Sequence, residues 1–115
     1  MKTNNDMVEM LSWVTRLALL ADKVPLWMRH RCDVRTSISS MGFSAFCEIK
    51  EPSGEGKAKE MVTVYDENVH VVYGFRNEEG IRKIERQNVE AFILAAEVAV
   101  LDAIEKFEKE EEDAA

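Results

Sequence analysis

The stretch DVRTSISSMGFSAFCEI, residues 33–49, decides the fold of this chain. On both sides of Gly42, apolar and small side chains alternate with polar ones, and a period of two indicates strands with one buried face. Gly42 permits the tight turn that would join the two segments. The sequence therefore predicts an antiparallel hairpin, with one strand over 33–40 and a second over 43–49.

Two more segments rich in β-branched and aromatic residues follow a loop-like stretch at 51–59. These segments, Met61–Tyr65 and Val69–Phe75, lie on either side of Asp66-Glu67-Asn68. Asn68 can take the left-handed conformation that a three-residue hairpin loop requires. The sequence predicts a second hairpin here, and therefore four antiparallel strands in total.

Helical periodicity precedes the strands. Apolar residues spaced three and four apart predict an amphipathic helix over 6–22, and Pro25 ends it. The predicted core stripe of this helix consists of Met7, Met10, Leu11, Val14, Leu17 and Ala18. Other apolar side chains, Trp13 among them, fall off that stripe, so the apolar face is wide.

A second helix is predicted over 78–110. At 1.5 Å per residue it would be roughly 50 Å long, whereas a compact globule of this length is roughly 35 Å across. We therefore expect either a break near Gln87–Asn88 or an end at Glu110–Asp113 that overhangs into water.

These elements predict an α+β fold with an N-terminal helix, a four-stranded antiparallel sheet and a long C-terminal helix, both helices lying on one face of the sheet. The 115 residues are 46% hydrophobic and 32% charged, as in globular proteins that pack one core. We expect residues 1–115 to form a single α+β domain whose acidic end, 108–115, is frayed.

The net charge of −7 comes from the last third of the chain. Residues 84–115 hold ten Asp or Glu against three Lys or Arg, whereas residues 1–50 hold five against seven. An acidic total argues against non-specific binding to nucleic acid. Glu9 and Arg16 interrupt the first apolar stretch, and the chain has only two cysteines. We therefore expect no membrane association and a cytoplasmic location.

The sequence contains no recognisable catalytic or cofactor-binding motif. The segment Ser53–Lys57 (SGEGK) is followed by Ala58 and a predicted strand, so it lacks the Ser or Thr and the helix of a phosphate-binding loop. The potential soft metal ligands are His30, Cys32, Cys47 and His70. They lack the close pairing typical of zinc sites. We predict no catalytic residue, no metal, no cofactor and two free thiols.

One local cluster of basic residues follows Trp27 and Met28. Arginine side chains near an aromatic ring suit the recognition of phosphate or carboxylate groups. An anion-binding site would consist of Arg29, Arg31, Arg35 and Arg76. In this alternative the protein binds nucleic acid, a nucleotide or another small phosphorylated ligand. The competing interpretation is that these arginines are solvated and pair with the acidic last helix.

The best functional indication is an excess of apolar surface on the helix segment 88–107. A second apolar stripe runs beside the core stripe, and one sheet and one helix cannot cover both. We predict a homodimer with Leu94, Val98 and Leu101 at its interface. The preferred function is a non-catalytic protein-interaction module. Such a module would be an accessory, regulatory or inhibitor protein that recognises a protein partner through its acidic helix.

Overall fold

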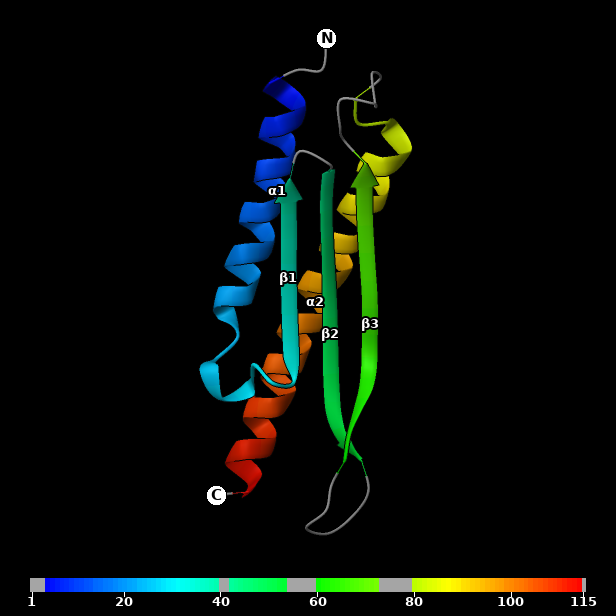
Figure 1. Cartoon of the computed structure of the whole chain (residues 1–115). Coiled ribbons are helices and arrows are strands. Elements are labelled where there is room, and N and C mark those ends of the chain that lie inside the picture. Colours follow the sequence, from blue (N-terminus) through cyan, green and yellow to red (C-terminus); the bar gives the residue numbers. More distant parts are fainter. Residues whose placement is uncertain (1–3, 40–41, 54–59, 73–79, 115) are drawn as a thin grey trace.

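The computed structural model describes residues 4–39, 42–53, 60–72 and 80–114. Its elements are helix α1 (Asn4–Lys23), the short 3-10 helix η1 (Leu26–Met28), strands β1 (Cys32–Ser39), β2 (Gly42–Ser53) and β3 (Glu60–Val72), and helix α2 (Lys83–Ala114). The strands form one antiparallel sheet in the order β1-β2-β3, with α1 beside β1 and α2 crossing behind the strands (Figure 1). The predicted α+β class and the order of helices and strands are confirmed.

The central strand β2 shows why both helices lie on one face. Its alternate residues Phe43, Ala45, Cys47 and Ile49 are buried in the core, whereas the residues between them are partly exposed. The ring of Trp13 from α1 packs against Phe43, with the centroids 5.4 Å apart. Alternating strand residues point to opposite faces, so the helices cover one face and leave the other open.

The predicted fourth strand is wrong. β3 runs without interruption from Glu60 to Val72, and residues 66–68 pair with residues 46–48 of β2 instead of forming a turn. The reason is the length of β2, whose twelve residues offer partners to almost all of β3. Ladder hydrogen bonds outweigh the local turn preference of Asp-Glu-Asn. Asn68 does not take the left-handed conformation that the predicted turn required, since no non-glycine residue in the described ranges has a positive φ.

Helix α1 forms where the periodicity predicted it, but its buried face is rotated relative to the predicted stripe and shares Met10 and Leu17 with it. Met10, Trp13, Leu17 and Leu20 are buried at three- and four-residue spacing, whereas Met7 and Leu11 of the predicted stripe are exposed. Apolar residues surround much of this helix, so local periodicity does not select the face. The large indole of Trp13 is the side chain that fills the space against the sheet.

Helix α2 is continuous through Gln87–Asn88, and its 32 residues span roughly 48 Å. The protein itself is elongated, with extents of 58 × 21 × 20 Å and a radius of gyration of 16.9 Å, against roughly 13 Å for a compact globule. The helix therefore fits along the long axis (Figure 1). Phe107 is buried near its end, and the acidic residues that follow are exposed. The sequence analysis expected either a break in this helix or an overhanging end because it assumed a rounder molecule.

A polar cluster joins the start of α2 to α1. Asp6 accepts hydrogen bonds from the Ile81 backbone N–H at 3.3 Å and from the Arg86 guanidinium at 2.9 Å, and Arg86 also pairs with Glu9 at 2.6 Å. Gly80 has a φ of 77°, and a Cβ at this position would collide with the Asp6 carboxylate. The positive φ therefore favours glycine where the chain enters α2, and a larger side chain would displace the Asp6 carboxylate.

Candidate interaction surface

Helix α2 carries a line of exposed apolar side chains. Leu94, Val98 and Leu101, which the sequence predicted as an interface, expose 58%, 62% and 44% of their surface. Residues three and four apart share one face of a helix, so these three side chains are neighbours. The core face of the same helix, which includes Ile93 and Val100, is buried. The described part of the chain therefore covers one of the two apolar stripes of α2 and leaves the other exposed.

A groove of about 560 Å³ lies between α2 and β3. Its residues from the helix are Asn88, Ala91, Phe92 and Ala95, and those from the strand are Tyr65, Glu67, Asn68, Val69 and His70. Ala91 and Ala95 are three residues from Leu94 and Val98, respectively, so the groove continues into the exposed stripe. We call this combination the α2–β3 surface: the exposed residues Ala91, Leu94, Ala95, Val98 and Leu101, together with β3.

The strand side of this surface is an edge of the sheet. Among the described strands, only β2 pairs with β3. Proteins usually protect edge strands by making them short or by placing proline or charge on them. β3 has thirteen residues and no proline, although it carries Asp66 and Glu67. An irregularity opposite Ile49 and Lys50 leaves Val64 without a register partner, so the straight part of β3 begins at Tyr65.

Sequence reasoning missed the strand side of the surface because it placed a turn at 66–68. A signal was present, since Tyr65, Val69 and Val71 keep the same parity across the supposed turn. That parity is typical of one uninterrupted strand. In the groove, the hydroxyl of Tyr65 is buried without a hydrogen-bond partner among the described residues. Burial is the main cause that raises the pKa of Tyr65, followed by the nearby Cys47 and Glu67.

Arg31, one of the four predicted anion-binding residues, is part of the core. Its side chain is 8% exposed, and its guanidinium lies 3.5 Å from the centroid of the Phe107 ring. It donates a hydrogen bond to the Lys50 carbonyl at 3.3 Å and pairs with Glu110 at 3.5 Å. The guanidinium therefore joins the end of α2 to the sheet.

The other predicted arginines have different surroundings. Arg35 lies on the open face of the sheet, is exposed, and pairs with Asp33 at 3.1 Å. Arg29 donates a hydrogen bond to the Val24 carbonyl at 3.1 Å. Arg76 lies outside the described residues. Arg31 lies in the turn before β1 and packs on the helix side, whereas Arg35 lies within the strand, opposite Phe46, on the other face.

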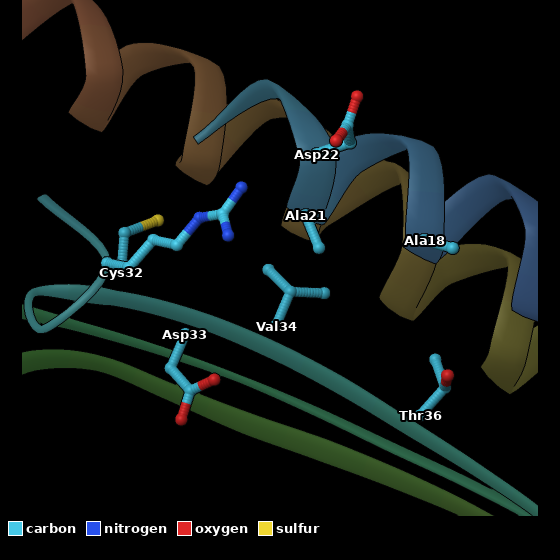
Figure 2. A pocket seen from close by; sticks show the side chains of 8 residues that line it. Ala18, Ala21, Asp22, Cys32, Asp33, Val34 and Thr36 are labelled. Carbon is cyan, nitrogen blue, oxygen red and sulfur yellow. The ribbon is translucent and has the colours of Figure 1, made fainter. Parts of the chain in front are cut away.

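A hollow of about 460 Å³ lies between α1 and β1 (Figure 2). Its residues are Ala18, Ala21, Asp22, Arg29, Cys32, Asp33, Val34 and Thr36. Figure 2 shows Ala21 of the helix and Val34 of the strand pointing toward one another across it. Two carboxylates line this hollow against one guanidinium. That balance disfavours an anionic ligand.

Cys32 and Cys47 are buried free thiols. Burial, with a smaller contribution from Asp33, raises the pKa of Cys32 to about 11. Burial, with smaller contributions from Cys32 and Asp33, raises the pKa of Cys47 to about 12. Because the thiolate is the reactive and metal-binding form, these values indicate structural cysteines. In the ranges that the structure describes, no group of three or more His, Cys, Asp or Glu is placed to hold a metal ion.

Neither α1 nor α2, over their described residues, is long and apolar enough to cross a membrane. Comparison of the chain with known protein families, with curated proteins and with solved structures finds no match.

Proposed function

We propose that this protein is a homodimeric protein-interaction module without a catalytic role, and that its subunits associate through the α2–β3 surface. The observation that carries the proposal is the exposed stripe of Leu94, Val98 and Leu101 beside the groove along β3. Contiguous exposed apolar surface next to a groove is typical of a protein–protein interface. A second copy would remove this surface from water.

Burial of the stripe of Leu94, Val98 and Leu101 does not by itself supply enough free energy for a stable dimer. Each of the three side chains is about half exposed, so burying it contributes roughly 1 kcal/mol. Two copies together gain roughly 6 kcal/mol, which is near the lower end of the estimated 4–15 kcal/mol cost of association. A stable dimer must therefore also use the groove and the strand beside it.

The exposed end of α2 supplies the surface for a protein partner. After Phe107, the exposed acidic residues are Glu108, Glu110, Glu111, Glu112 and Asp113, with Lys109 among them. Such a helix end complements a basic groove on another protein, as expected for an accessory, regulatory or inhibitor protein. The alternative, binding of nucleic acid or a phosphorylated ligand, has less support because Arg31 is engaged with Phe107 and Arg35 lies on the other face.

The dimer is tested by introducing charge into the stripe. We expect wild-type protein at tens of micromolar to scatter light as twice the 13.1 kDa mass of one chain. Leu94→Glu combined with Leu101→Glu should give 13.1 kDa and an unchanged helical circular-dichroism spectrum, because two buried carboxylates per copy oppose association. Leu19→Glu is the matched control, since Leu19 of α1 is 60% exposed. A monomeric wild type would contradict the proposal, and a dimeric double variant would place the interface elsewhere.

The acidic end is tested by neutralising it without changing its shape. We expect replacement of Glu108, Glu111 and Glu112 by Gln, with Glu110 kept because it pairs with Arg31, to abolish recovery of the protein partner from a lysate of the native host, because the attraction is electrostatic. Replacement of Arg29 and Arg35 by Gln is the matched control and should leave recovery unchanged. Mass spectrometry and nucleic-acid detection on the same eluate provide the measurement. Recovery of nucleic acid alone, lost in the arginine variant, would favour the alternative function.

A further inference from the structure

We propose that, in the dimer, β3 of one copy pairs antiparallel with β3 of the second copy at a two-fold axis beside Asn68. The two three-stranded sheets then form one six-stranded sheet, with both α2 helices on the same side. This inference rests on the proposed homodimer and specifies how its subunits join.

The free edge of β3 is the first argument. Between Tyr65 and His70, its outer backbone N–H and C=O groups have no partner strand among the described residues. A second copy of the same strand supplies such partners at once, as in other edge-strand associations. The five β3 residues that line the groove all fall between Tyr65 and His70, in the straight part of the strand. Pairing along this part would also bring the second copy over the groove.

The position of α2 restricts the register. Directly opposed residues of antiparallel strands point to the same face of the sheet. If the two-fold axis passed between two residues, every residue would oppose one of the other parity, and the helices of the two copies would lie on opposite faces. The exposed stripes of α2 could not meet in that arrangement. The axis must therefore pass beside a single residue of β3.

Charge then selects that residue. An axis beside Asp66 or Glu67 would place this carboxylate opposite its own copy, which is unfavourable for like charges. An axis beside His70 would leave Asp66 opposite a position beyond the end of β3. An axis beside Asn68 places Asp66 of each copy opposite His70 of the other. In each of these two pairs, the imidazole can donate a hydrogen bond to the carboxylate. An axis beside Val69 would leave Asp66 without such a partner. Charge complementarity therefore favours Asn68.

The helix packing agrees with this choice. Asn68 lines the groove together with Ala91 and Ala95, so the axis would pass close to these two alanines. Their small side chains allow two antiparallel α2 helices to approach to the usual 8–10 Å between axes. Leu94 and Val98 lie beside the alanines on the same helix and would pack across the axis.

The register is tested with introduced cysteines. A residue on the axis faces its own copy with Cβ atoms roughly 5 Å apart, close enough for a disulfide after a small adjustment. We expect Asn68→Cys to form at least roughly tenfold more covalent dimer under mild oxidation than His70→Cys or Asp66→Cys alone. An equimolar mixture of the last two variants should form the mixed disulfide. All three positions are exposed, so folding is preserved. Wild-type protein controls for Cys32 and Cys47, which are buried.

Light scattering on the reduced variants separates the possible outcomes. A dimer in which Asn68→Cys links no better than His70→Cys would overturn the inference and leave the proposed homodimer intact. A protein that stays monomeric would overturn both. Efficient linkage at Asn68 in a protein of dimeric mass, abolished by Leu94→Glu with Leu101→Glu, would establish the shared axis.

Discussion

Replacing Trp13 with alanine is expected to lower the free energy of unfolding by about 3–5 kcal/mol, as is typical when a large buried aromatic side chain is removed. Trp13 is almost completely buried and connects three elements. Its ring packs against Phe43 of β2, and its Nε1–H donates a hydrogen bond to Glu90 of α2 at 3.1 Å. The alanine variant leaves a cavity under the sheet and removes this bond between the two helices.

Urea unfolding followed by circular dichroism provides the measurement. Wild type and variants are compared at one protein concentration, because dimerisation makes the apparent stability depend on concentration. Trp27→Ala is the matched control, since Trp27 is 45% exposed and its loss should cost less than about 1 kcal/mol. Equal losses for the two tryptophans would contradict the assignment of Trp13 to the core.

The two predicted hairpins, one confirmed and one wrong, explain what can be predicted from this sequence. Around Gly42 the predicted turn residue and the alternating segments agree, and β1 and β2 pair antiparallel with Ser39 opposite Gly42, whose φ is 146°. At 66–68 the local turn preference conflicts with pairing to the far part of β2, and the pairing prevails. The turn preference at 66–68 can be read from the local sequence, but the length of the partner strand β2 cannot. The sequence therefore did not predict β3 as one long edge strand.

The candidate sites divide in the same way. The exposed stripe of Leu94, Val98 and Leu101 follows from helical periodicity, because a helix with two apolar faces cannot bury both against one layer. The anion-binding site, in contrast, was predicted because its arginines are close together along the chain. Arg31 lies in the turn before β1 and packs on the Phe107 ring of α2, whereas Arg35 lies in the strand on the opposite face, and only the fold reveals this separation.

The second large effect is expected at the other end of the core. Phe107→Ala should lower the free energy of unfolding by about 3–5 kcal/mol, because the ring is buried and packs under the Arg31 guanidinium. Phe107→Leu keeps most of the apolar volume and should cost less than about 2 kcal/mol, a loss that includes the cation–π contribution. Ile84→Ala, at an exposed position of the same helix, is the control and should change stability little.

The elongated shape makes this variant informative about cooperativity. Phe107 lies near the C-terminal end of α2, remote along the helix from the Asp6–Arg86 cluster that holds its start. If the protein unfolds as one unit, Phe107→Ala lowers the urea midpoint and leaves the slope unchanged. Hydrogen exchange should then show equal losses of protection in both halves of α2. Loss confined to residues after Val100, with an unchanged midpoint, would contradict the expected global effect. It would show instead that the acidic end opens separately from the α2–β3 surface.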